Sequence, residues 1–164
     1  MSIAGVTRVV QILVASLIAG VTVFLMIALA LGPVSKPAPA IVAGLPLITA
    51  VSVLFALILI PISIVVPRLV TESRVGQIAK GPPTFDQDQL LATYQTQTIV
   101  GAAMNEAPAF FAAIAYMLEG NPIALGLVLL LLIGIAARFP TVPKVEAWVE
   151  DKLLKLAEKR QGGG

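Results

Sequence analysis

The sequence predicts an all-α integral membrane protein, in which a bundle of four transmembrane helices forms two helical hairpins and is followed by a C-terminal amphipathic helix at the membrane interface. Apolar residues make up 58% of the chain and charged residues 12%, whereas soluble domains average about 45–50% and 25%. Four apolar stretches divide the sequence. Ten of the eleven Lys and Arg residues fall on one side of the resulting topology.

The predicted spans cover residues 9–31, 43–66, 97–118 and 122–138. A helix needs about 20 residues, at 1.5 Å each, to cross a ~30 Å hydrocarbon layer. The first three stretches meet this requirement. The fourth is short, so we expect local thinning of the bilayer or close packing there. Residues 1–140 are therefore predicted to form one transmembrane domain.

Basic residues in the short loops predict the orientation of the bundle. Lys36 alone lies on one side, and the other side holds Arg8, Arg68, Arg74, Lys80, Arg138, Lys144, Lys152, Lys155, Lys159 and Arg160. Because Lys and Arg are retained on the cytoplasmic side of a membrane, both termini are predicted to be cytoplasmic. The external turns then cover residues 32–40 and 119–122. We take a bacterial plasma membrane as the default location.

The first span has a second interpretation, as a secretory signal peptide with a small-residue cleavage site at Ala28-Leu29-Ala30. Its apolar stretch has 23 residues, and the apolar regions of signal peptides usually have about 7–15. The sequence therefore favours a transmembrane helix.

The connections carry helix-start signals. Asn121 before Pro122 predicts a capped helix start and a tight turn between the third and fourth helices. Asp86 with Gln89 indicates that the third helix begins in the cytoplasm, which puts Tyr94 at the headgroups as an interfacial anchor. Residues 68–80 fit either a short surface helix or a loop.

Residues 141–160 are predicted to form a cytoplasmic amphipathic helix, followed by a flexible tail at 161–164. An apolar stripe recurs at spacings of three and four residues, through Val145, Trp148, Val149, Leu153 and Leu156. This stripe favours a helix that lies along the inner leaflet, with Trp148 as a second interfacial anchor. The alternative is that residues 144–160 dock a partner or a second copy of the chain.

The third span carries one carboxylate, Glu106, deep in the predicted hydrocarbon layer. Pro108 frees the carbonyl of Met104 from its helical hydrogen bond and predicts a kink, and Pro61 does the same for Leu57. A protonated Glu106 would donate a hydrogen bond to a neighbouring helix, at Ser16 or at the Leu57 carbonyl. Alternatively, Glu106, Asn105, Met104 and Ser16 form a proton or sodium site, because intramembrane carboxylates are costly and often functional.

The stretch from Met104 through Glu106-Ala107 to Tyr116 resembles the ion-carrying helix of rotary ATPase proteolipid subunits. The resemblance implies ion binding at Glu106. It is confined to this helix, because the glycine-repeat helix and the polar Arg-Gln-Pro or Arg-Asn-Pro loop of that family are missing. The sequence is therefore not assigned to the family.

Composition excludes many functions. The chain has no cysteine and no histidine, which removes disulfides, thiol nucleophiles, haem ligation and nearly every zinc or copper site. We predict no cofactor, no metal and no catalysis. The net charge of +2 does not indicate nucleic acid as a partner.

Two functional hypotheses remain. The first is a non-catalytic membrane scaffold, anchor or accessory subunit. The second is an oligomer that translocates protons, cations or small solutes at Glu106. We expect the lipid bilayer as a partner, and the Ala- and Gly-rich third span or the 144–160 helix as the contact for another copy or for a membrane-protein partner.

Overall fold

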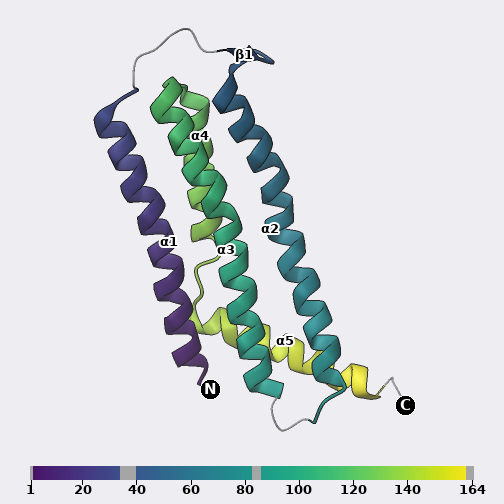
Figure 1. Cartoon of the computed structure of the whole chain (residues 1–164). Coiled ribbons are helices and arrows are strands. Elements are labelled where there is room, and N and C mark those ends of the chain that lie inside the picture. The colour runs from purple at the N-terminus through teal and green to yellow at the C-terminus, as the bar shows by residue number, and fades with distance from the viewer. Residues whose placement is uncertain (1, 34–39, 83–85, 162–164) are drawn as a thin grey trace.

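The computed structural model describes residues 2–33, 40–82 and 86–161, and these are nearly all helical. The elements are α1 (Ile3–Leu31), β1 (Ile41–Val42), β2 (Leu45–Pro46), α2 (Leu47–Ala79), α3 (Asp86–Glu119), α4 (Pro122–Ala136) and α5 (Val142–Gln161). Helices α1, α2 and α3 are long and apolar enough to cross a membrane. The start of α1 and the end of α5 lie at the same end of the molecule (Figure 1). Lys36 and the tail residues 162–164 lie outside the described residues.

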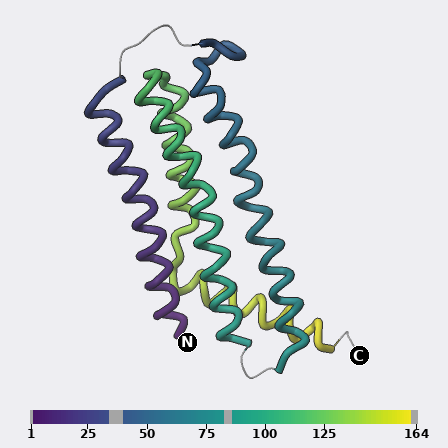
Figure 2. The backbone as a smooth tube through the Cα atoms, in the orientation of Figure 1, coloured from purple at the N-terminus to yellow at the C-terminus, as the bar shows by residue number. Residues whose placement is uncertain are grey.

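Helix α3 is the centre of the bundle. It packs against α1, α2 and α4, and it lies between α1 and α2 in both ribbon views (Figure 2). Its alanines allow this close approach, because their small side chains let the backbones of neighbouring helices lie near each other. Such packing holds helices together in lipid, where no hydrophobic driving force acts between them. Five of the alanines are fully buried: Ala102, Ala109, Ala112, Ala113 and Ala115. The first predicted hairpin is thus open, since α3 separates its two helices.

The second predicted hairpin is tightly closed. The Asn121 side chain accepts a hydrogen bond from the backbone N–H of Ile123 at 2.9 Å, and Pro122 is the first helical residue. Gly120 supplies the positive φ of 66° that the turn needs. This capped turn agrees with the sequence signal. Helix α4 ends at Ala136, however, so its 15 residues span only ~22 Å.

Helix α2 differs most from the sequence prediction. Residues 41–46 form a β-hairpin whose turn residues Ala43 and Gly44 have φ of 53° and 79°, as a two-residue primed turn requires. The helix therefore begins at Leu47 rather than at residue 43. It then runs without interruption through Pro61 and Pro67 to Ala79, with Lys80 as its C-cap, so residues 68–79 continue α2 and form no separate surface helix or loop.

The beginning of α2 is capped from another helix. Pro46 at its N-cap offers no side-chain acceptor. Instead the Glu119 carboxylate, at the end of α3, accepts hydrogen bonds from the backbone N–H groups of Ile48 and Thr49, both at 2.8 Å, and from the Thr49 hydroxyl at 2.7 Å. A carboxylate at this position satisfies free N–H groups and complements the helix dipole. It also aligns the start of α2 with the C-terminal end of α3.

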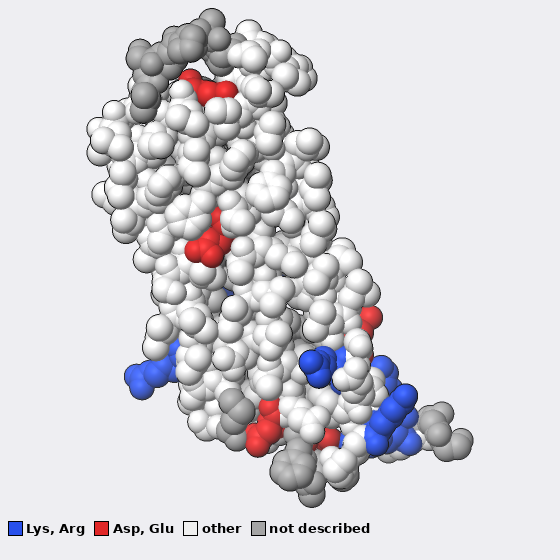
Figure 3. Space-filling model, in the orientation of Figure 1, with Lys and Arg blue, Asp and Glu red and all other residues white. Residues whose placement is uncertain are grey.

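Helix α5 crosses the other end of the bundle (Figure 1). Its stripe residues Val145, Val149 and Leu156 are buried against the bundle, while Leu153 and Leu154 remain exposed. Much of the predicted stripe therefore covers protein. Basic side chains gather near this end on the face shown in Figure 3, and the middle of that face is uncharged apart from one acidic patch.

Arg160 fastens the end of α5. Its guanidinium donates to both carboxylate oxygens of Asp86, at 2.6 and 3.0 Å, and to the backbone carbonyls of Ile78, Ala79 and Gly81 at 3.2 to 3.3 Å. One side chain thus joins α5 to the end of α2 and the start of α3. The Asp86 carboxylate raises the pKa of Arg160 above its usual value.

Candidate functional site

Glu106 faces α1. A Cβ placed on Gly20 would lie 4.0 Å from Oε1 of Glu106 and 3.7 Å from Cζ of Phe110, so the glycine provides the room in which these side chains lie. Glu106 is ~20 Å along the α3 axis from Glu119. It is partly exposed and has no hydrogen bond or ion pair among the described residues.

The other residues of the predicted ion site make no hydrogen bond to Glu106 within the described part of the chain. Asn105 is buried and faces α4, where a Cβ on Gly134 would lie 3.2 Å from Nδ2 of Asn105. Its Oδ1 accepts no hydrogen bond from the described part of the chain. Ser16 is exposed and donates to the carbonyl of Leu13 at 2.8 Å. Met104 is half-buried, and the Asn105 and Glu106 side chains lie against different helices, α4 and α1.

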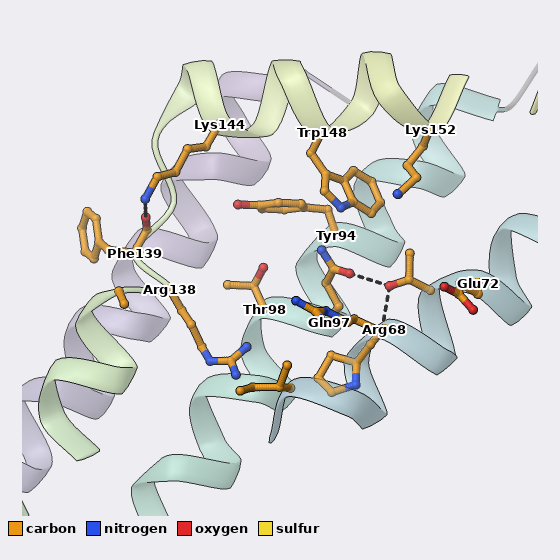
Figure 4. A pocket seen from close by; sticks show the side chains of 14 residues that line it. Arg68, Glu72, Tyr94, Gln97, Thr98, Arg138, Phe139, Lys144, Trp148 and Lys152 are labelled. Carbon is orange, nitrogen blue, oxygen red and sulfur yellow. Dashed lines mark hydrogen bonds between the residues drawn. The ribbon is translucent and has the colours of Figure 1, made fainter. Parts of the chain in front are cut away.

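A polar pocket of about 680 Å³ lies near the α5 end of the bundle (Figure 4). Three helices and the 137–139 connection contribute to its wall. The lining residues are Ile64, Pro67, Arg68, Thr71 and Glu72 of α2; Tyr94, Gln97 and Thr98 of α3; Ala137, Arg138 and Phe139; and Lys144, Trp148 and Lys152 of α5.

Arg138 reaches furthest into the bundle. Its Nη2 donates to the backbone carbonyl of Ser63 at 2.7 Å and to the Ser63 hydroxyl at 3.2 Å. That carbonyl is free because Pro67, four residues later, has no N–H to donate. The guanidinium therefore supplies the donor that the proline removes from α2.

Gly101 makes room for this guanidinium. A Cβ at Gly101 would overlap Nη1 of Arg138 and would lie 2.8 Å from its Cζ. One turn further along the antiparallel pair, Gly134 of α4 makes room for Asn105 of α3. Two glycine contacts of this kind, one on each helix, fix the register of α3 and α4.

Tyr94 and Trp148 pack on each other beside the pocket. Their ring centroids are 5.3 Å apart at an interplanar angle of 67°, an edge-to-face contact between α3 and α5. Lys152 Nζ lies 5.7 Å from the Trp148 ring centroid. The two predicted interfacial anchors thus hold α5 over the pocket in the structure. Thr71 and Gln97 are hydrogen-bonded across the α2–α3 contact.

The pocket is rich in positive charge. Four basic side chains and one acidic side chain line it, and Arg68 is close enough to Arg138 for mutual repulsion. Lys152 is paired with Asp151 at 2.8 Å. Within residues 2–33, 40–82 and 86–161, Arg68, Arg138 and Lys144 have no carboxylate partner. Lys144 donates only to the carbonyl of Phe139, at 3.4 Å.

Sequence reasoning did not identify this pocket. In the sequence, Arg138 is only one of the basic residues that predict the orientation, and the sequence prediction gives Pro67 no role. A usable signal was present, because a proline always frees the carbonyl four residues before it, and here that carbonyl belongs to Ser63 in an apolar helix. The sequence offered no means of pairing it with Arg138.

No group of three metal-binding side chains occurs in the described part of the chain. Comparison of the chain with protein-family models, with curated proteins and with solved structures gives no significant match.

Proposed function

We propose that this protein is a non-catalytic, four-span membrane protein with both termini in the cytoplasm, and that it acts as a scaffold, anchor or accessory subunit through its cytoplasmic end. The observation that carries the proposal is the attachment of α5 to that end. Arg160 and the buried residues Val145, Val149 and Leu156 hold a charged helix across the bundle. Such a rigid, exposed surface is suited to binding a partner.

The path of the chain after α4 supports the fourth span. Helix α4 alone covers ~22 Å, and the connection that follows it continues in the same direction to α5 at the other end of the bundle (Figure 1). Gln11 of α1 donates to the carbonyl of Pro140 at 3.0 Å, so the buried end of this connection has a hydrogen-bond partner in the bundle. Non-helical backbone is tolerated at membrane depth where protein buries it.

The orientation is supported by the asymmetry of charge. Basic residues occur at the end that carries α5, together with the start of α1. Under the positive-inside rule, this end is cytoplasmic and the β-hairpin at residues 41–46 is external. Helix α5 then lies at the level of the inner headgroups, with its exposed Leu153 and Leu154 able to contact lipid.

Cysteine labelling in intact cells tests the topology, because the chain has no native cysteine. We choose three exposed positions: Ile41 in the β-hairpin, Ile123 at the start of α4 and Lys155 on α5. Ile41→Cys and Ile123→Cys should react with a membrane-impermeant maleimide from outside. Lys155→Cys should react only after the cells are opened. Reaction of Ile123→Cys and Lys155→Cys from the same side would contradict the fourth span.

Translocation through an oligomer is the second candidate function. The observation that favours it is Glu106, a partly exposed carboxyl midway along apolar helices and next to Gly20. A second copy that covered this face would bury the carboxyl where a transported cation needs it. The candidate requires an oligomer, and a monomer in mild detergent would count against it.

A further inference from the structure

The basic pocket lies at the depth where lipid headgroups meet hydrocarbon. Counted at 1.5 Å per residue, Ser63 is ~24 Å from Leu47 along α2, and Gly101 is ~27 Å from Glu119 along α3. Leu47 and Glu119 are level, because Glu119 caps the start of α2. The Arg138 guanidinium is therefore near the far edge of a ~30 Å hydrocarbon layer.

Arg138 is fixed in place and has donors to spare. A guanidinium has five N–H groups, and only Nη2 donates to protein, at Ser63. No described residue accepts from Nε or Nη1. A held arginine with unused N–H donors is suited to charge-assisted recognition of a phosphate or carboxylate, because little entropy is lost when the anion binds.

The neighbouring charges favour an anion over any other ligand. Arg68 and Arg138 repel each other, and Lys144 adds a third cation that lacks a carboxylate partner among the described residues. Partial burial strengthens such repulsion, since the local dielectric constant is lower than that of water. A bound anion would relieve it. Glu72 is the one carboxylate in the lining and opposes an anion there.

The remaining wall suits an amphiphile. Thr71, Gln97 and Thr98 supply polar groups on the α2 and α3 sides, whereas Ile64 and Phe139 are exposed apolar side chains at the border of the same pocket. An anion that carries acyl chains could place its charge at Arg138 and its chains past these two residues. The volume of about 680 Å³ exceeds the needs of a phosphate ion alone.

We propose that this pocket binds the phosphate group of an anionic lipid from the adjacent leaflet, with Arg138, Arg68 and Lys144 as its ligands. The inner leaflet as the source of that lipid rests on the proposed function, which places α5 in the cytoplasm. The chemistry recognised is the phosphate oxyanion, and a soluble phosphate is its other source.

Trp148 allows a direct measurement, because it is the only tryptophan of the chain and lines the pocket. The full-length protein in mild detergent is titrated with dioctanoyl phosphatidic acid while Trp148 fluorescence is recorded. Dioctanoylglycerol, the same lipid without its phosphate, is the matched ligand control. Thermal unfolding supplies a second readout, since a ligand that binds only the native state raises the midpoint. We expect saturable binding and a raised midpoint with phosphatidic acid alone.

Variants assign the ligands. Arg68→Gln and Lys144→Gln should each weaken binding about tenfold, as expected for a lost charge-assisted hydrogen bond. Arg138→Lys keeps the positive charge but removes the planar guanidinium with its N–H donors, so this variant should also weaken phosphatidic acid binding. Arg74→Gln is the matched control, because Arg74 is exposed on the same helix and outside the pocket. Glu72→Gln has the opposite expected sign and should strengthen binding.

The outcomes separate the alternatives. If inorganic phosphate at millimolar concentration displaces phosphatidic acid, the ligand is a soluble phosphate. If it does not, the ligand is the headgroup of an anionic lipid. Equal responses to phosphatidic acid and dioctanoylglycerol would overturn the proposal. So would wild-type affinity in both Arg68→Gln and Lys144→Gln, or an equal loss in Arg74→Gln. Lipid binding in detergent does not depend on how the protein is oriented in a membrane. If the proposed topology is wrong, only the cysteine labelling will therefore show it.

Discussion

The Arg138 guanidinium lies directly against the backbone of Gly101, with no space between them for a methyl group. The contact joins the end of α4 to the face of α3 that also carries Asn105. It brings Arg138 to the Ser63 carbonyl, and so links three helices at one level. Arg138 can therefore lie in this position because residue 101 is a glycine.

Gly101→Ala should displace Arg138 from Ser63. The new methyl group overlaps Nη1, and overpacking of this kind costs about 1–3 kcal/mol of folding stability. Thermal unfolding in detergent, followed by circular dichroism, measures the loss. Gly126→Ala is the matched control, because nothing lies within 4 Å of a Cβ there. Equal midpoints for the two variants would contradict the contact.

Glu119→Gln should loosen the beginning of α2. The amide keeps one acceptor oxygen, and the variant loses the negative charge and the second acceptor, so we expect a loss of about 1–2 kcal/mol. Amide hydrogen exchange should accelerate at Ile48 and Thr49, whose N–H groups the carboxylate binds. Glu146→Gln, at an exposed glutamate of α5, serves as control. Unchanged exchange at both positions would refute the cap.

Glu106→Gln distinguishes the two candidate functions. Glutamine preserves size and hydrogen bonding but cannot titrate. If the protein is a scaffold, folding and assembly should survive the change. If it translocates ions, proton or sodium flux in proteoliposomes should fall to background. Flux by the unchanged protein that persists in the variant would rule out Glu106 as the ion site.

Arg160→Gln should free the end of α5. The variant loses the bidentate contact with Asp86 and the donors to three backbone carbonyls. We expect faster hydrogen exchange in residues 152–161 and earlier protease cleavage near Gly81, with the centre of α3 unaffected. Lys159→Gln changes the neighbouring charge and should have no such effect. If both variants exchange alike, the clamp does not hold α5.

Asp151→Asn should strengthen anion binding in the pocket. Hydrogen bonds from Lys152 and Lys155 lower the pKa of Asp151 from 3.8 to about 2, so these pairs stabilise the fold above pH 3.8 and are lost as the pH falls towards 2. At neutral pH, the Asp151 carboxylate is therefore charged and paired with Lys152. The variant releases Lys152 towards Trp148 and the pocket, and the phosphatidic acid titration should show a lower Kd. An unchanged Kd would mean that Lys152 does not reach the anion.

Much of the architecture followed from local signals. The apolar stretches predicted the long helices α1, α2 and α3, and the Asn121-Pro122 pair predicted the α3–α4 turn. These features depend on composition and on residues close in sequence, so pattern reasoning reaches them. The sequence prediction for residues 68–80, a short surface helix or a loop, was wrong, because α2 continues past Pro67 to Ala79 and Arg138 supplies a donor for the carbonyl that Pro67 frees.

For the candidate ion site too, the sequence predicted one part and the structure supplied the rest. The sequence marked Glu106 as an unusual carboxyl, and the structure gives it Gly20 as a neighbour. Asn105 precedes Glu106 in sequence, yet a helix turns each successive residue by about 100°, so the two side chains face α4 and α1. Proximity along the chain therefore did not make a cluster.

By itself, the sequence determined that the chain forms long apolar helices suited to a membrane and that its basic residues gather on one side of them. Only the tertiary structure decided which helices touch, and with it the Glu119 cap, the Arg160 clamp and the pocket around Arg138. Hydropathy and charge are properties of single segments, whereas these contacts join residues as far apart as Ser63 and Arg138. Their formation depends on the register in which Gly101 and Gly134 let α3 and α4 approach.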